Sequence, residues 1–480
     1  MLRGHRIADW NPENASAWDA GNNVIARRNL LWSIVTAHVA FSVWSLWSVM
    51  ALFMPQSVYG FSTGDKLLLG ATASLVGAFA RLFYPMANAR LGCRDWAVLS
   101  SLLLVVPTSG AIVLLAHPGL PLWPYLLCAA LNGLGAGNYS SSLANSEAFY
   151  PQRLKGFALG LTGGIANLGS AAIQAVGLVA LAVAGNLAPY WVCVIYLLLL
   201  AIGALGAALF MNNLDYRIGM SDFRSILPLL DSWGISFLYL TCFGSFLGFA
   251  FAFGQVLQHN FLASGQTSAQ AALHAAEIAF LGPLLGAAGR VVGGRLSDWI
   301  GGGRVTLGAV TAMVVAAVLL IAVSTHDDVA RGSGGYVSGL TMIGYVVGFI
   351  VLFTLSGVGS GSVFKLIPSV FEARSGALGI GDADRLDWAR VRSGALIGFA
   401  GAIGTLGGVG INVVLRQAYD SFGTATPAFW VFLLCYVVAA VLTWMRYVRR
   451  QGQGRSTSGS GSTGSAMAAS GSASTTSART

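Results

Sequence analysis

The chain has 480 residues, of which 55% are hydrophobic and only 9% are charged, and its formal net charge is +9. Soluble globular proteins carry about 25% charged residues, so this composition excludes an ordinary soluble domain. Apolar runs long enough to cross a hydrocarbon core about 30 Å thick recur along the chain. The sequence therefore predicts an all-α membrane protein with many transmembrane helices.

We predict twelve transmembrane helices. They lie near residues 30–54, 67–89, 96–116, 121–146, 154–184, 187–211, 234–258, 275–298, 305–325, 336–366, 392–415 and 427–447. With the N-terminus inside, only Lys66, Arg331 and Arg416 of the 27 Lys and Arg residues fall on the outer side, while Arg81 and Arg290 lie mid-membrane. Basic residues accumulate on the cytoplasmic side. We therefore expect a multi-pass protein of the cell membrane with both termini cytoplasmic, and we read the positive charge as a sign of orientation rather than of a nucleic-acid partner.

The segments outside the predicted helices are polar. Residues 1–29 are expected to form a cytoplasmic leader, partly helical and near the membrane surface, without the features of a cleavable signal peptide. Residues 212–233 form a cytoplasmic linker, and the charged link 369–390 is also expected in the cytoplasm. Residues 449–480 are rich in Gly and Ser and too poor in apolar bulk to fold, so we expect a disordered cytoplasmic tail.

Enzyme and cofactor chemistry finds little support in the sequence. The five cysteines lie in or beside apolar segments at unrelated spacings, which indicates neither a disulfide framework nor a zinc site. The chain lacks HExxH, paired mid-span carboxylates and a phosphate-binding nucleotide loop. We expect no enzymatic activity, no cofactor and no metal, and a chain that functions as a monomer in the lipid bilayer.

The first predicted helix contains His38 and an aromatic run from Phe41 to Trp47. We interpret the aromatic run as helix packing and as part of the aromatic belt at the membrane interface.

The second half of the chain repeats the first, which predicts two pseudo-symmetric six-helix halves at residues 30–211 and 234–448. Arg81 lies eleven residues before Gly92, and Arg290 lies eleven before Gly301. Two further glycine patterns recur in the same register, with Asn167 corresponding to Thr405: Gly133, Gly135 and Gly137 with Gly357, Gly359 and Gly361, and Gly160, Gly163 and Gly169 with Gly398, Gly401 and Gly407. Many transporters build a central binding site between such repeats.

A loop between the eighth and ninth predicted helices carries a family pattern. Gly294, Asp298, Gly301 and Arg304 are spaced as in the signature of the major facilitator superfamily, which the loop resembles. The corresponding loop of the first half keeps Arg90, Gly92 and Arg94 but has Ala89 in place of the aspartate. The resemblance implies the twelve-helix fold of that superfamily.

The two mid-span arginines point to an anion. A charged side chain at that depth costs about 2.5–3.5 kcal/mol on insertion scales. Snorkelling would have to carry Arg81 across about two to three helical turns, and the sequence places no acidic residue at comparable depth to neutralise either arginine. Because guanidinium is planar, permanently charged and offers paired donors, the pair suits a small planar oxyanion. Sugar and drug transport are disfavoured, whereas nitrate, phosphate and carboxylates remain open.

The glycine-rich stretch 132–174 narrows the choice. It is similar to the nitrate signature of the nitrate/nitrite porter family of the major facilitator superfamily, and residues 398–408 are similar to the second signature of that family. The resemblance covers nearly all of residues 30–448 and extends to 239–249 and 359–364. The residues of the first signature are Gly133, Gly135, Gly137, Asn138, Tyr139, Ser140, Ser141, Ser142, Asn145, Phe149, Pro151, Lys155, Gly156, Phe157, Ala158, Leu159, Gly160, Asn167, Leu168 and Gly169.

The resemblance implies roles for individual residues. Arg81 and Arg290 would clamp the anion, Tyr139, Tyr239 and Phe243 would wall it, and Asn167 would donate a hydrogen bond. The fifth and eleventh helices would slide or bend at Gly160, Gly163, Gly164, Gly169, Gly398, Gly401, Gly407 and Gly408. The sequence departs from the family at Thr162 and Ala166, where asparagine and glycine are usual, and at Tyr139, where phenylalanine is common.

These features favour an alternating-access transporter that exchanges nitrate and nitrite, because closing an empty site around two unpaired charges is costly. The alternative is a proton-coupled nitrate symporter, which needs a titratable group near the path. His38 is the candidate because imidazole titrates near neutral pH, with Glu147 the weaker one, although a hydrogen-bonded structural histidine is the other interpretation of His38. From a different class, the chain could be a nitrate sensor that binds the anion without moving it.

Overall fold

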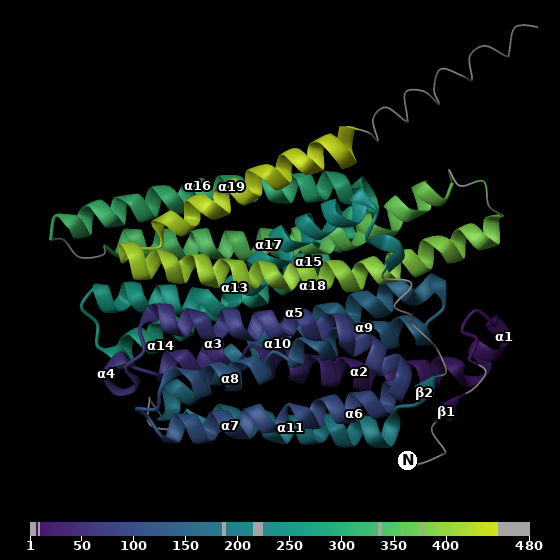
Figure 1. The fold of residues 1–480 in the computed structure, drawn as a ribbon, viewed down its shortest axis with the longest axis horizontal. Coiled ribbons are helices and arrows are strands. Elements are labelled where there is room, and N and C mark those ends of the chain that lie inside the picture. Colours follow the sequence, from purple (N-terminus) through teal and green to yellow (C-terminus); the bar gives the residue numbers. More distant parts are fainter. Residues whose placement is uncertain are drawn as a thin grey trace, which may run out of the picture.

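The structure, a computed structural model, describes residues 6–7, 10–184, 189–214, 224–334, 338–376, 379 and 381–449. Two layers of roughly parallel helices lie against each other, one from each half of the chain (Figure 1). The first layer, in purple and blue, contains α1 (Ala15–Ala17), α2 (Asn23–Trp44), α3 (Leu46–Met50), α4 (Gln56–Tyr59), α5 (Thr63–Leu91), α6 (Cys93–Leu103), α7 (Val105–Ala116), α8 (Leu122–Asn132), α9 (Gly135–Phe149), α10 (Gln152–Ala184) and α11 (Tyr190–Phe210).

The second layer, in teal, green and yellow, holds most of the remaining helices (Figure 1). These are α13 (Leu230–Ala263), α15 (Leu281–Ile300), α16 (Gly302–Gly332), α17 (Gly339–Ser375), α18 (Asp382–Phe422) and α19 (Thr426–Thr443). The short helix α14 (Ser268–Ala279) packs on α13 and on α10 of the first layer. We call the end of the bundle where α5 begins and α18 ends the distal end, and the opposite end, beside α1, the leader end. Along the boundary between the layers, α5 packs on α18 and α10 packs on α15.

Among the described residues, ten helices are long and apolar enough to cross a membrane, or eleven if the bent pair Ala15–Trp44 and Leu46–Phe53 counts as one span. The remaining predicted segment, 121–146, forms α8 and α9, which are interrupted at Gly133 and Leu134. Both of these residues keep right-handed helical dihedral angles, so the interruption is a local irregularity in a continuing helical path. The structure confirms an all-α membrane protein.

The repeat predicted from the arginine and glycine spacing has a counterpart in the backbone. Gly92 separates α5 from α6 with φ 99° and ψ 148°, and Gly301 separates α15 from α16 with φ 92° and ψ 137°. A positive φ of this size is strained for any residue with a side chain, which explains glycine at both places. The two halves therefore turn between their second and third long helices in the same way.

Several segments outside the membrane spans form secondary structure or pack against the helices. In the leader, β1 (Arg6–Ile7) pairs in parallel with β2 (Asn213–Leu214), the strand that follows α11. The Trp10 indole Nε1 donates to the carbonyl oxygen of Phe149 at 3.3 Å, and the Trp18 ring packs edge-on against Tyr150 at 5.6 Å. The leader thus packs against the junction between α9 and α10.

The charged link 369–390 contains only a short non-helical connection. The α17 helix continues to Ser375 and α18 begins at Asp382, so most of this segment is helical. Charged residues mark where a helix leaves the apolar layer, not where its backbone hydrogen bonds end. Residues 215–223 of the predicted linker and 450–480 of the predicted tail lie outside the described residues.

The aromatic run of the first helix is buried rather than interfacial. Phe41 and Trp44 are fully buried and Trp47 is 1% exposed. Packing therefore explains this run, and the interpretation as a membrane-interface belt is wrong for these three rings.

Polar contacts join the two halves in the distal part of the bundle. The Gln174 Nε2 of α10 donates to the Ala250 carbonyl oxygen of α13 at 2.9 Å, and the Gln258 Nε2 of α13 donates to the Leu52 carbonyl oxygen at 3.3 Å. These bonds, together with the packing of α5 on α18, close the distal end of the boundary.

Candidate functional site

Arg81 and Arg290 approach each other across the boundary between the two halves. Arg81 extends from α5 and is 1% exposed, and Arg290 extends from α15 and is partly buried. Both guanidinium groups lie against the same ring, because Phe243 of α13 has its centroid 4.9 Å from Arg81 Cζ and 5.6 Å from Arg290 Cζ. The structure therefore brings together two residues that are 209 positions apart and that the sequence relates by repeat.

Aromatic rings form the walls around the pair. The Tyr139 ring of α9 lies 4.7 Å from Arg81 Cζ. Tyr239 stacks on Phe243 with centroids 5.0 Å apart and planes 6° from parallel. A cation over an aromatic face gains about 0.5–2 kcal/mol, depending on how fully it is desolvated. The rings thus offset part of the cost of burying the charges and leave the guanidinium edges to hydrogen-bond a ligand.

Most of the donors at this site have no partner within the protein. Arg290 Nη2 donates to the Tyr239 hydroxyl at 3.2 Å, but Arg290 Nη1 and Arg81 Nε and Nη2 are buried without an acceptor. The Tyr139 hydroxyl is also buried and unpaired. Asn167 is 1% exposed, and its unpaired atom is an acceptor, Oδ1, which an anion does not satisfy. No carboxylate among the described side chains forms an ion pair with either arginine.

Buried polar atoms in folded proteins are almost always paired, so such a group of unpaired donors needs an explanation. An anion that binds between Arg81 and Arg290 supplies both the missing acceptors and the missing negative charge. The site has the chemistry of a compact oxyanion receptor.

Sequence reasoning missed two residues of this site. Trp44 of α2 lies 5.3 Å from Arg81 Cζ, and Phe364 of α17 lies 4.8 Å from Arg290 Cζ. Trp44 stood in the run interpreted as packing and interface, and Phe364 stood at the end of a family-like stretch without an assigned role. Their spacing alone contains no signal of the site, because a helical aromatic residue is as easily explained by packing.

The glycines proposed to flex lie in unbroken helices, but they differ in what surrounds them. A Cβ at Gly169 would lie 2.5 Å from the His38 carbonyl oxygen, and one at Gly407 would lie 2.4 Å from the Leu240 carbonyl oxygen. Gly408 is similarly close to Leu247 Cδ2, at 2.9 Å. These three glycines allow α10 and α18 to approach a neighbouring helix.

Two other glycines of the set border the site itself. A Cβ at Gly163 would lie 3.0 Å from the Tyr139 hydroxyl, and one at Gly401 would lie 3.6 Å from Arg81 Nη1. By contrast, Gly160 has nothing within 4 Å and Gly164 meets only Val291 at 3.6 Å. Gly398 lies within α18, half-buried. Some glycines of the set therefore allow close helix packing, whereas others lie beside the site.

His38, the main residue considered for proton coupling, has a hydrogen-bond partner within the protein, unlike most of the arginine donors. His38 Nδ1 hydrogen-bonds the Ile165 carbonyl oxygen at 2.8 Å, which ties α2 to α10. This geometry supports the structural interpretation of His38. The side chain of Glu147 lies outside the described ones.

The removal of one unpaired group gives a direct prediction. Tyr139→Phe keeps the ring beside Arg81 but deletes the unpaired hydroxyl. If that hydroxyl donates to the bound anion, we expect the KM for nitrate to rise about fivefold, which corresponds to the loss of one hydrogen bond of about 1 kcal/mol, with kcat changed little. Initial rates over a range of nitrate concentrations in proteoliposomes measure this, and an unchanged KM would remove the hydroxyl from the binding site.

Comparisons with known proteins identify the fold and the family. A family model for the Major Facilitator Superfamily matches residues 32–383. The solved structure of the nucleoside transporter NupG superposes with a TM-score of 0.56 at 15% sequence identity, and covers 87% of this chain and 99% of that one. At this identity the likeness shows the fold alone.

Two relatives are similar over nearly their whole length. The nitrate/nitrite transporter NarU of Escherichia coli (strain K12) is 32% identical over 470 residues, which is 93% of this chain and 96% of that protein. The probable nitrate/nitrite antiporter NarK2 of Thermus thermophilus is 27% identical over 93% of this chain and 98% of its own length.

The fold and the matched family model define the chain as a transport protein of the major facilitator superfamily, not an enzyme. Within that superfamily, it belongs to the nitrate/nitrite porter family. The family loop between α15 and α16 is also in place, with Asp298 in an ion pair with Lys365 of α17.

Proposed function

We propose that this protein exchanges nitrate and nitrite across the cell membrane by alternating access. The observation that carries the proposal is the pair Arg81 and Arg290, which meet at the boundary between the halves with buried, unpaired guanidinium donors. A planar anion of one negative charge fits between two planar forks and accepts from both. The names of the relatives, nitrate/nitrite transporter and nitrate/nitrite antiporter, support this class of substrate.

In this proposal Arg81 and Arg290 clamp the anion, and the Tyr139, Tyr239 and Phe243 rings wall it. Asn167 places its side-chain amide at the same site. The distribution of Lys and Arg supports an orientation with both termini in the cytoplasm, so that the distal end is extracellular. The polar contacts in the distal part then correspond to a state closed to the outside.

Exchange follows from the electrostatics of the site. Without an anion, closing both ends of the boundary would bury two positive charges with no neutralising partner, which is strongly unfavourable. With an anion bound, the cost falls by the charge-assisted hydrogen bonds that form. The loaded carrier therefore reorients more easily than the empty one, and one anion leaves in return for another. The carrier needs no second copy of the chain for this, so we also propose a functional monomer.

Counterflow in proteoliposomes tests the proposal. Vesicles loaded with nitrite and placed in nitrate should take up nitrate at a rate that requires internal anion and is insensitive to an imposed pH gradient of matched voltage. Uptake into anion-free vesicles driven by an inward proton gradient would favour the proton-coupled symporter instead. Nitrate binding without any flux would identify a sensor.

A further inference from the structure

The Tyr139 hydroxyl adds a buried donor to the candidate site that belongs to neither arginine. It has no hydrogen-bond partner, and the Tyr139 ring lies with its centroid 4.7 Å from Arg81 Cζ. The ring also packs edge-on against Phe41 of α2 at 5.8 Å. The hydroxyl faces α10, where a Cβ at Gly163 would lie 3.0 Å from its oxygen, and it is close enough to Arg290 to interact with that side chain electrostatically. A donor from α9 therefore stands beside both guanidinium groups.

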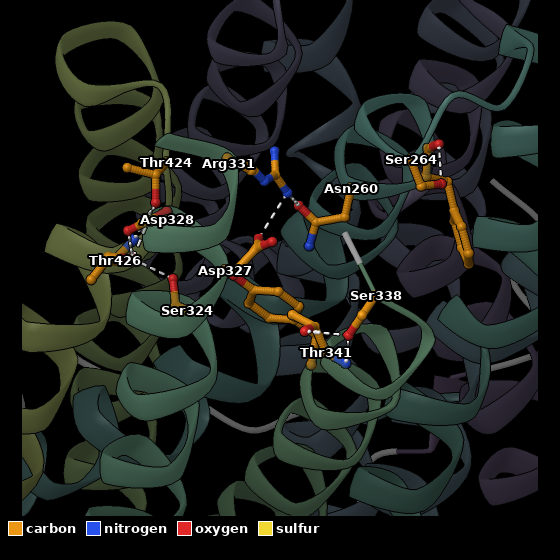
Figure 2. Close-up of polar contacts among 12 residues, drawn as sticks. Asn260, Ser264, Ser324, Asp327, Asp328, Arg331, Ser338, Thr341, Thr424 and Thr426 are labelled. Atoms are coloured by element: carbon orange, nitrogen blue, oxygen red, sulfur yellow. Dashed lines mark hydrogen bonds and ion pairs between the residues drawn. The ribbon is translucent and has the colours of Figure 1, made fainter. Parts of the chain in front are cut away.

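The polar cluster at the distal end of the bundle differs from the candidate site, because its charges are paired within the protein (Figure 2). Asp327 of α16 is 2% exposed and accepts from Arg331 Nη2 at 2.8 Å, and the same nitrogen donates to Asn260 Oδ1 at 3.1 Å. The carboxylate and the guanidinium neutralise each other there. The two arginines of the candidate site have no carboxylate partner among the described side chains, so their free donors and the Tyr139 hydroxyl are left for an anion.

The free donors of the arginines match the part that nitrate and nitrite share. Arg81 Nε and Nη2 are both buried without an acceptor, and these two atoms form one edge of the guanidinium. Such an edge binds two oxygens of one oxyanion side by side. Arg290 donates through Nη2 to the Tyr239 hydroxyl at 3.2 Å and keeps Nη1 as a single free donor. The arginines thus offer donors for two oxygens, which both anions possess.

Nitrate and nitrite differ in one oxygen. Nitrate is planar with three equivalent oxygens, whereas nitrite has two oxygens and a lone pair on nitrogen in the third direction. A donor placed to reach the third oxygen lies one bond length too far from that nitrogen. When nitrite is bound, such a donor stays buried without an acceptor, which is unfavourable. A site that hydrogen-bonds one group of its substrate thereby rejects an analogue that lacks the group.

We propose that the Tyr139 hydroxyl donates to the third oxygen of nitrate and so makes the site prefer nitrate to nitrite. Arg81 and Arg290 bind both anions, and Tyr139 discriminates between them. With both anions present at equal concentration, nitrate occupies the site more often. This inference rests on the proposed function, because it assigns the two anions to the same site.

Binding of both anions to Tyr139→Phe tests the inference. Isothermal titration of the purified full-length protein with nitrate, and separately with nitrite, gives the two dissociation constants. We expect the ratio of the nitrite constant to the nitrate constant to fall about fivefold in Tyr139→Phe, because nitrate loses one hydrogen bond and nitrite loses none. An unchanged ratio, including an equal loss of affinity for both anions, would overturn the inference.

Tyr125→Phe is the matched control for the loss of a buried tyrosine hydroxyl. Tyr125 of α8 is fully buried in the same half, and its hydroxyl donates to the Leu114 carbonyl oxygen at 2.9 Å. Because this hydroxyl already has an acceptor within the protein, Tyr125→Phe should keep the wild-type ratio of the two dissociation constants. A fivefold fall in this variant too would overturn the assignment to Tyr139.

A second variant moves the hydroxyl without removing it. In Gly163→Ala the added Cβ would lie 3.0 Å from the hydroxyl oxygen, so the oxygen must shift. We expect the ratio to fall about twofold, because the hydrogen bond to the third oxygen is weakened. In Gly160→Ala, one turn earlier on α10, nothing lies within 4 Å of the added Cβ, and the ratio should stay at the wild-type value. Equal ratios in the two alanine variants would contradict the placement of the hydroxyl.

Counterflow separates this inference from the proposed function. If the wild type binds and exchanges both anions while Tyr139→Phe keeps the wild-type ratio, the inference alone is wrong. If the wild type exchanges neither anion, the proposed function is wrong and the inference with it.

Discussion

Replacement of Arg81 or Arg290 by lysine is expected to reduce nitrate affinity by at least tenfold in either variant. Lysine keeps the positive charge but loses the planar fork, so the anion can no longer accept two parallel hydrogen bonds from one side chain. A hydrogen bond to a charged group contributes about 1.5–3 kcal/mol, and each substitution removes at least one. Isothermal titration of the purified protein with nitrate measures the affinity, and counterflow measures its effect on exchange.

Matched controls exist on the same two helices. Arg90 lies on α5 and Arg295 on α15, and both are exposed near the leader end. Arg90→Lys and Arg295→Lys should leave nitrate affinity unchanged. Wild-type affinity in both Arg81→Lys and Arg290→Lys would show that positive charge alone binds the anion and that the clamp geometry is incorrect.

The second large effect is expected at Gly407, where a single methyl group should nearly abolish exchange. In Gly407→Ala, the added Cβ would lie 2.4 Å from the Leu240 carbonyl oxygen and 2.7 Å from Gly244 Cα. Both neighbours are backbone atoms of α13, so α18 and α13 must move apart as whole helices. That displacement reaches the site, because Tyr239 and Phe243 of α13 flank the arginine pair. We expect exchange to fall by more than tenfold.

Gly410→Ala is the control for this substitution. Gly410 is in the same helix, three residues later, and nothing lies within 4 Å of its added Cβ. Alanine is the better helix former by about 1 kcal/mol, so Gly410→Ala should be neutral or slightly stabilising. If both variants exchange normally, close packing at Gly407 is not required for transport. If Gly410→Ala is as defective as Gly407→Ala, backbone flexibility of α18 matters more than its packing.

The glycine signature could be recognised from the sequence, but the sequence could not tell which of its glycines pack closely on another helix. Gly160 and Gly169 belong to the same signature, yet only Gly169 has backbone of another helix within 2.5 Å of an added Cβ. The spacing of the glycines tells which face of a helix is smooth. It does not tell which of them touch a partner, because that depends on where the neighbouring helix crosses.

The hydrogen bond of His38 and the position of Asp327 show the same limit for titratable groups. A histidine in the first helix attracted attention because it lies deep in an apolar segment, and the structure occupies its Nδ1 with a backbone carbonyl. Asp327 and His259 lie near the ends of their helices in the sequence and gave no signal there. Both line one small cavity at the distal end, where Arg331 of α16 donates to Asn260 of α13, and only the tertiary structure brings them there.

The sequence by itself determined the membrane class, the duplication, the family and the two charged residues of the candidate site. Each of these depends on composition or on fixed spacing along one chain: apolar runs, Arg81 and Arg290 in equivalent registers, and Gly92 and Gly301 at equivalent turns. The tertiary structure alone decided which aromatic rings enclose the arginines, which donors remain unpaired and where α18 closes the distal contact. These depend on the angle and depth at which helices pack, and the rings around the arginines alone come from four helices, α2, α9, α13 and α17. Local sequence does not specify such packing, because many apolar side chains satisfy the same burial.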